Sequence, residues 1–195
     1  WNVHGGIMAS ELTVQTIKGP TSGGNANKII IPTGQALEVT DNIRYEDMPV
    51  GSILQVINDS TATYTSTNST SYVATNLSCQ ITPKFANSKI HLNVNGSVWF
   101  GTANAAGNYV IATIYRNGSN IGPGSAPYNS MMFYGAHGTS YESWDRMVGF
   151  QHVDSPNSTS QVTYQVYLRS YNNNHDARLF EGITSNTITA MEIKQ

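Results

Sequence analysis

Hydrophobic and polar residues alternate along most of the chain, with a period of two rather than the roughly 3.6 residues of a helix. Residues 89–100 and 160–171 show the pattern most clearly. The apolar side of the first is formed by Ile90, Leu92, Val94, Val98 and Phe100, and that of the second by Val162, Tyr164, Val166 and Leu168. The opposite side of the second carries Thr163, Gln165, Tyr167 and Arg169. Both segments are predicted to be strands with one buried and one wetter face.

Further strands are predicted at 51–57, 62–66, 77–82, 108–116, 130–135, 144–153, 177–180 and 187–194. Asn117-Gly118 is predicted to form a tight hairpin turn, because both residues tolerate positive φ. Gly96 is predicted to lie at a bend or bulge. Short strands at such spacings, with no convincing amphipathic helix, favour an all-β fold. We therefore expect an antiparallel, jelly-roll-like β-sandwich over residues 51–195.

Residues 1–50 have a different pattern, with brief apolar runs separated by a flexible connector at 19–27. A segment of this length has too little apolar surface to fold alone. We expect it to be an attachment and trimerisation segment in an intertwined homotrimer. In the extended β neck of that trimer, apolar side chains of three copies would meet; the candidates are Ile29, Ile30, Ile31, Leu37 and Val39.

Composition excludes several classes of partner. The 195 residues include 10 Lys and Arg against 12 Asp and Glu, and only 11% of residues are charged. This leaves no basic stripe for a phosphate backbone, so no nucleic-acid partner is expected. No apolar run is long enough to cross a bilayer, and residues 1–7 lack the regions of a signal peptide, so no membrane insertion is expected. The single Cys79 is predicted to be a buried, inert thiol.

The sequence offers little support for catalysis or for a bound metal. Its histidines form no metal-binding motif, and no cofactor or metal ligand is assigned. Glu142, Asp145 and Asp154 lie near His137 and His152 in the sequence, and they would form a site only if folding brought them together. There is no nucleophile elbow and no glycine-rich phosphate loop, so no catalytic residue is assigned and no enzyme is expected.

Aromatic residues give a stronger indication of binding. They gather where the alternation is poorest, between 127 and 144, and the polar loop at 172–176 is expected at an apex of the sandwich. The candidate contacts for a receptor or glycan are Tyr128, Tyr134, Tyr141, Trp144, Asn172, Asn173, Asn174, His175 and Asp176. The alternatives are that the aromatic residues belong to the core or to a subunit interface, and that the loop is simply a polar turn.

Five segments together resemble one family. They are SELTVQTIKG (10–19), NKIIIPTGQALEV (27–39), MPVGSILQV (48–56), SKIHLNVNG (88–96) and TITAMEIKQ (187–195). The chain resembles, over residues 8–195, small virion proteins of tailed bacteriophages, particularly marine and cyanobacterial ones. The resemblance implies a trimer with an N-terminal attachment segment and a C-terminal jelly roll, and it transfers no catalytic residue. The sandwich is also similar to C1q and tumour-necrosis-factor trimers in architecture alone.

The resemblance implies a virion surface protein, made in the host cytoplasm, with two possible placements. As a tail fibre or fibre-like protein, it would attach to other virion proteins and present the sandwich to a host-surface glycan or outer-membrane protein. As a head fibre or decoration protein, it would sit on the capsid. The candidate attachment residues are Trp1, Val3, Ile7, Leu12, Val14 and Ile17. A C1q-like binding module and a glycan-cleaving enzyme are the less favoured alternatives.

Overall fold

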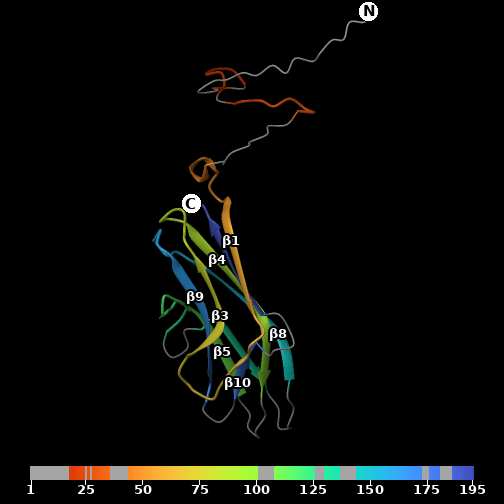
Figure 1. Ribbon diagram of the computed structural model, residues 1–195, viewed down its shortest axis with the longest axis vertical. Helices are drawn as coiled ribbons and strands as arrows, with labels where there is room; N and C mark the ends of the chain where they lie inside the picture. Colours follow the sequence, from red (N-terminus) through yellow and green to blue (C-terminus); the bar gives the residue numbers. More distant parts are fainter. Residues whose placement is uncertain are drawn as a thin grey trace, which may run out of the picture. The chain divides into compact units, whose positions relative to one another are not determined.

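The computed structural model describes residues 18–24, 26, 28–35, 44–100, 108–125, 130–136, 144–172, 176–180 and 186–195. Within strands, the side chains at 100, 108, 133–136 and 144–145 lie outside this description. The chain divides into two units, Trp1–Ile43 and Arg44–Gln195. The second unit is all-β, with a short 3-10 helix, η1 (Tyr45–Asp47), before its first strand (Figure 1).

The strands of the second unit follow in the order β1 (Ile53–Thr61), β2 (Thr65–Thr67), β3 (Val73–Ile81), β4 (Lys89–Phe100), β5 (Asn108–Arg116), β6 (Ser119–Asn120), β7 (Met132–Ala136), β8 (Trp144–Asp154), β9 (Val162–Ser170), β10 (Ala177–Leu179) and β11 (Asn186–Ile193). They form two antiparallel sheets. The first, sheet A, has the order β1-β11-β4-β10-β2, with β8 pairing along the other edge of β4. Sheet B has the order β3-β9-β5-β6, with β7 also pairing β5. The expected jelly-roll-like sandwich is therefore confirmed.

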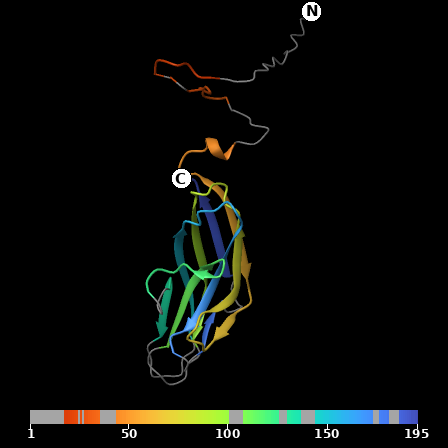
Figure 2. The same cartoon turned by 90° about the vertical axis from the view of Figure 1, so that its left-hand side faces the viewer.

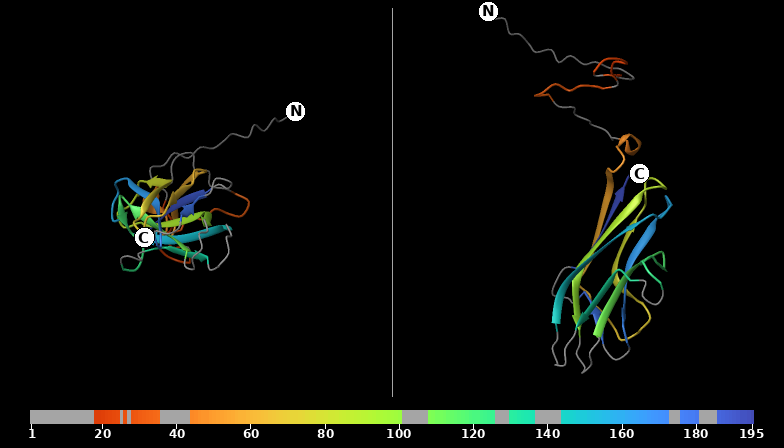
Figure 3. Two further views of the ribbon diagram at one scale, coloured as in Figure 1. Left: turned by 90° about the horizontal axis from the view of Figure 1, so that it is seen from below. Right: turned by 180° about the vertical axis from the view of Figure 1, so that it is seen from behind.

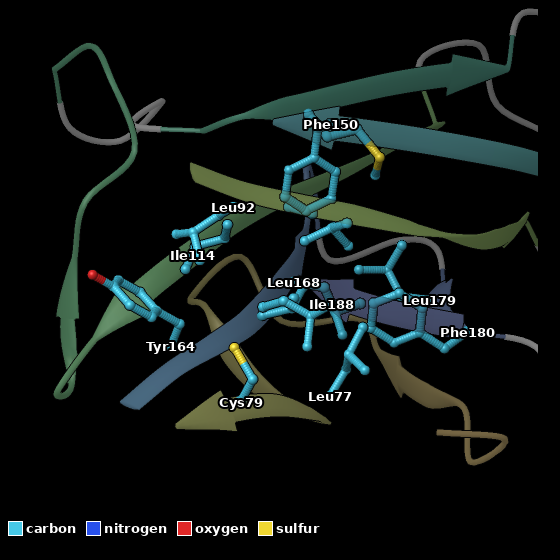
Figure 4. Packing of buried hydrophobic residues seen from close by; sticks show 14 of the residues in the cluster. Leu77, Cys79, Leu92, Ile114, Phe150, Tyr164, Leu168, Leu179, Phe180 and Ile188 are labelled. Carbon is cyan, nitrogen blue, oxygen red and sulfur yellow. The ribbon is translucent and has the colours of Figure 1, made fainter. Parts of the chain in front are cut away.

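The core lies between the two sheets and is built from the alternating apolar positions. Leu92 of β4, Ile188 of β11 and Leu168 of β9 are fully buried there, and Phe150 of β8 is nearly so (Figure 4). The apolar sides predicted for 89–100 and 160–171 are confirmed wherever the side chain is described. Strands β3, β4, β5, β8, β9, β10 and β11 contribute most of this one core, with Met132 of β7, and the outward positions of the two sheets form the outer faces of the sandwich.

Strand bounds agree with the predicted segments to within a few residues, with two differences. β1 continues through the polar residues 58–61, because the backbone of β11 pairs with it as far as Asn186. The two-residue strand β6 was not predicted; it is the return strand of the hairpin at Asn117-Gly118. That turn is confirmed, since φ is 48° at Asn117 and 82° at Gly118.

Gly96 does not lie at a bulge. The register between β4 and β8 runs through it without a shift, from Ile90 opposite Asp154 to Phe100 opposite Trp144. The glycine is needed for space, because a Cβ atom there would lie 2.6 Å from Cδ1 of Phe180. The sequence shows the glycine but not this long-range neighbour.

The described part of the first unit contains turns and no strand. Gly19 lies against the backbone of Lys28, where a Cβ atom on the glycine would clash with the lysine carbonyl. A turn at Pro32–Gln35, with φ of 85° at Gly34, follows the isoleucine run. The predicted neck residues Leu37 and Val39 lie outside the described residues.

Candidate functional site

The predicted contact residues are only partly described. Tyr128, Tyr141, Asn173, Asn174 and His175 lie outside the described residues, as do Trp1, Val3, Ile7, Leu12, Val14 and Ile17. The backbone of Tyr134 lies in β7 and that of Trp144 begins β8, so these two positions belong to different sheets. Asn172 is half-buried just after β9, and Asp176 is exposed just before β10. Whether these residues bind anything stays a prediction.

The predicted neck residues that are described are exposed. The relative exposures of Ile29, Ile30 and Ile31 are 57%, 55% and 42%. Three consecutive exposed isoleucines present apolar surface to water. Contact with another protein surface would bury it.

The outer face of sheet A carries amide, hydroxyl and apolar side chains, and we call it the amide face. The register of β1, β11, β4 and β8 places on it Ile53, Val56, Asn58, Ser60, His91, Asn93, Asn95, Met147, Gln151, Val153, Thr187, Thr189, Met191 and Ile193. Among these residues only His91 can carry a charge. Charged residues lie at the two ends of this outer side: Lys89 at one end, and Arg178, over the ring of Trp99, at the other. The long strands β4 and β8 run side by side across it (Figure 3, right).

Side chains on the amide face bond to one another across the strands. Thr189 Oγ1 donates to Asn58 Oδ1 at 2.8 Å, which links β11 to β1. Nε2 of His91 lies 3.0 Å from Oε1 of Gln151, which links β4 to β8. These hydrogen bonds already satisfy part of the polar groups of the amide face. Removing water from the face therefore costs less free energy than it would for the same groups without hydrogen-bond partners.

The apolar members of the amide face are well exposed in a single chain. Met147 is 63% exposed, Val56 53%, and Ile53 and Val153 each 52%. They come from both edges of sheet A, so they extend across the width of the face. Large exposed apolar patches rimmed by polar groups are typical of interaction surfaces.

The outer face of sheet B carries a cluster of tyrosines, and we call it the tyrosine face. Its members are Tyr72, Tyr109, Tyr115, Tyr167 and Tyr171, together with Ser78, Thr113, Gln165 and Arg169. It lies over β9 and β5, which are paired neighbours (light blue and green in Figure 2). The sequence had assigned Gln165, Tyr167 and Arg169 to the outward side of β9, but it gave no sign that tyrosines of β5 and of the segment before β3 gather there.

Ring contacts organise the tyrosine face. Tyr115 and Tyr167 are stacked, with centroids 3.8 Å apart and an angle of 17° between the rings. Tyr72 meets Tyr115 edge to face at 6.0 Å, and Tyr109 meets Tyr171 in the same way at 5.2 Å. The guanidinium of Arg169 lies 5.5 Å from the centroid of Tyr72.

Asp154 is a nearly buried carboxylate that joins the two sheets. Nη1 of Arg116 donates to both of its carboxylate oxygens, at 2.9 and 3.0 Å, and Tyr164 donates its hydroxyl at 2.6 Å. Burial and the hydrogen bond to Asp154 raise the pKa of Tyr164 well above its usual range. Burial lowers the pKa of His152, and the Asp154 carboxylate lies close enough to oppose this lowering with a smaller effect. Asp154 joins β8 of sheet A to β5 and β9 of sheet B.

Glu192 is a second buried carboxylate that the sequence did not single out. It is 0% exposed, and its Oε1 accepts from the backbone N–H groups of Lys84 and Phe85 and from the hydroxyl of Ser88. Its Oε2 accepts from Nε2 of Gln55 at 2.6 Å. These bonds fix the loop between β3 and β4 onto the last strand.

Neither a metal cluster nor a long apolar helix occurs in the described ranges. Within them, no three His, Cys, Asp or Glu side chains are grouped so that they could hold a metal ion. The same ranges contain no helix long and apolar enough to cross a membrane.

Comparisons with known proteins find distant structural similarity only. The sequence matches no protein-family model, and no curated protein is similar to it in sequence. Among solved structures, dimeric latent PorU from Porphyromonas gingivalis is 11% identical over 87% of this chain and 15% of that one, with a TM-score of 0.38. VP2 of infectious bursal disease virus, in a subviral particle, is 13% identical over 84% of this chain and 46% of that one, with a TM-score of 0.33. The protein of T=1 particles derived from the bursal virus is 13% identical over 90% of this chain and 44% of that one, with a TM-score of 0.35.

The chain spans less than half the length of each of these proteins. At such scores the likeness is distant and carries no functional information.

Proposed function

We propose that this chain is a structural protein of a bacteriophage particle. In this proposal it is a homotrimeric tail fibre or fibre-like protein, made in the host cytoplasm and displayed on the virion, whose sandwich contributes to adhesion to the host surface. The observation that carries the proposal is the amide face, the part of the outer face of sheet A between Lys89 and Arg178, which has one ionisable member and exposed apolar side chains from both edges of the sheet.

The composition of the amide face suits contact with other copies of the same chain. Around a threefold axis the same face of three copies would come together, so like charges there would repel; among the residues named for the amide face only His91 can carry a charge, and Lys89 lies at its end. Met147, Val56 and Val153 are each more than half exposed and would gain from burial. Covering the isoleucine run at 29–31 would add apolar contact in the N-terminal unit.

The remaining parts of the proposal rest on the family resemblance. Other virion proteins would hold the N-terminal segment, and a host glycan or outer-membrane protein would be the surface partner, with no role for nucleic acid or membrane insertion. We propose no enzymatic activity. Incubating the protein with host polysaccharide should release no oligosaccharides, and release would overturn that part.

The capsid decoration alternative uses the same trimer at another place on the particle. Gold-labelled antibody against the sandwich, viewed on intact particles by electron microscopy, separates the two placements. Label at the tail supports the fibre, and label spread over the head supports decoration. Particles without label would contradict a virion role.

A further inference from the structure

The tyrosine face has the features of a preorganised binding surface. Tyr115 and Tyr167 support each other by stacking, and Tyr72 closes against the edge of the pair. Rings held in this way lose little conformational freedom when a ligand binds. The stacked pair is half-buried rather than covered, so part of each ring is accessible in the sandwich.

The hydroxyls of the stacked pair can bond to a ligand. Neither Tyr115 nor Tyr167 makes a side-chain hydrogen bond to any residue in the part of the chain that the structure describes. Burial raises the pKa of Tyr115, and Tyr167 beside it adds to the effect, so the Tyr115 hydroxyl remains protonated at neutral pH. It therefore acts as a neutral donor and acceptor.

The charge on this face is shielded. Arg169 is only 5% exposed; its Nη1 donates to the carbonyl of Thr70 at 2.9 Å, and its guanidinium lies over the ring of Tyr72. No carboxylate lies on this face among the described residues. A charged ligand would find no exposed charged side chain to pair with. A neutral ligand could bind without removing water from any exposed charged side chain of this face.

The face is also long. Tyr109 and Tyr171 form a second ring pair, and Tyr171 is 41% exposed. Tyr171 follows Tyr167 by four residues, which corresponds to about 13 Å at the rise of a strand. Two aromatic points at this separation fit an extended ligand better than a single small ring.

We propose that the tyrosine face binds a neutral glycan chain. Sugar rings present apolar C–H surfaces and neutral hydroxyls in alternation, which match aromatic rings beside neutral hydroxyl and amide groups. Tyr115 and Tyr167 form the centre of the site, and Tyr109 and Tyr171 extend it. The inference rests on the adhesion role proposed above and assigns that role to the sheet B face instead of the aromatic segment at 127–144 and the loop at 172–176.

The test uses the intact protein on an array of short neutral oligosaccharides of glucose, galactose, mannose and rhamnose, with uronate-containing oligosaccharides printed beside them. Saturable binding to neutral members, unchanged in high salt, is expected. Tyr115→Ala and Tyr167→Ala should each weaken binding at least about fivefold, the effect of losing a residue central to an interface. Tyr115→Phe should retain part of the affinity, because it keeps the ring and removes only the hydroxyl.

Tyr64→Ala is the matched control, since Tyr64 is 48% exposed and lies outside the tyrosine face. Each variant must keep the circular dichroism spectrum and the mass in solution of the parent. No binding to any neutral member, binding to uronates alone, or alanine variants that bind as tightly as the parent would each overturn the proposal. Binding to host cells that survives periodate but not protease would instead identify a protein partner. None of these outcomes depends on where the protein lies on the particle, so they are independent of the labelling experiment above.

Discussion

At the scale of single residues, Gly96 shows how a long-range neighbour constrains a strand. Phe180 is buried with φ at 67°, a conformation rarely adopted by a large side chain, and its ring occupies the space beside Gly96. A Cβ atom at position 96 would also lie 2.7 Å from Oδ1 of Asn186, which accepts from the backbone N–H of Ser97. The ring and the amide are both fixed, so neither can retreat easily.

Gly96→Ala is therefore expected to lower the free energy of unfolding by about 1–3 kcal/mol, the usual cost of overpacking. Urea unfolding followed by circular dichroism measures it. Gly149→Ala is the control, because its close contact, at 2.9 Å, is the end of the exposed Asn95 side chain, which can move. Equal losses in the two variants would contradict this explanation.

Cys79 is the residue with the clearest chemical expectation. It is 2% exposed, and burial, with a smaller contribution from Asp59, raises the pKa of its thiol to about 12. The thiolate is the reactive form, so the folded protein should not react with a thiol reagent at about pH 8. One equivalent should react once the protein is unfolded in guanidinium chloride. Rapid reaction of the folded protein would show that the thiol is accessible.

His152 makes stability depend on pH. Burial lowers the pKa of His152 below its ordinary 6.5, against an opposing effect of Asp154. The unfolded chain then binds the proton more tightly than the folded chain, so stability is full above about pH 6.5 and falls as the pH drops below it. His152→Gln should reduce the loss of stability between about pH 7.5 and pH 5, measured by thermal melting. An unchanged loss in the variant would assign the pH dependence to other groups.

At the scale of elements, Glu192 ties the end of the chain to the loop after β3. The carboxylate accepts hydrogen bonds from four partners although it is fully buried. Glu192→Gln keeps the shape but points an amide donor at other donors, and should cost about 2–4 kcal/mol of stability. Ser88→Ala removes one donor and should cost about 1 kcal/mol. Unfolding both variants in denaturant measures the two losses of stability. A larger loss for Ser88→Ala than for Glu192→Gln would refute this explanation.

The elements themselves were largely predictable from the sequence, because alternation is a local property. The segment 89–100 coincides with β4, and Asn117-Gly118 forms the expected turn. The extension of β1 through 58–61 was not predictable, because it depends on pairing with β11 rather than on its own polar residues.

The two outer faces of the sandwich could likewise be predicted only in part from the sequence. Alternation placed Tyr167 and Arg169 on the outward side of β9, but only strand pairing brings Tyr115 and Tyr72 beside them. The amide face likewise draws on β1, β4, β8 and β11, which are far apart in the sequence. A site formed across strands has no local sequence motif, whereas the aromatic cluster at 127–144 was conspicuous because its residues are neighbours in the chain.

At the scale of the whole molecule, the two sheets give the sandwich two unlike outer faces. The amide face is nearly uncharged and has exposed apolar side chains, which suits contact between copies. The tyrosine face has ordered rings and neutral hydroxyls, which suits a glycan. Homotrimer formation through the first would leave the second outward on every copy, and a trimer would then offer three equivalent sites whose avidity exceeds the affinity of one.

Light scattering during size-exclusion chromatography tests the central claim most directly. The intact chain has a mass of 21.2 kDa, and the account predicts three times that mass in solution. Val56→Glu and Met147→Glu, which place a carboxylate on the amide face, should shift the protein toward the monomer. Gln80→Glu places a carboxylate at an exposed position on the outer side of β3 in sheet B, opposite Thr163, and should leave the trimer intact. A monomeric parent, or a trimer that tolerates carboxylates at both 56 and 147, would contradict the account.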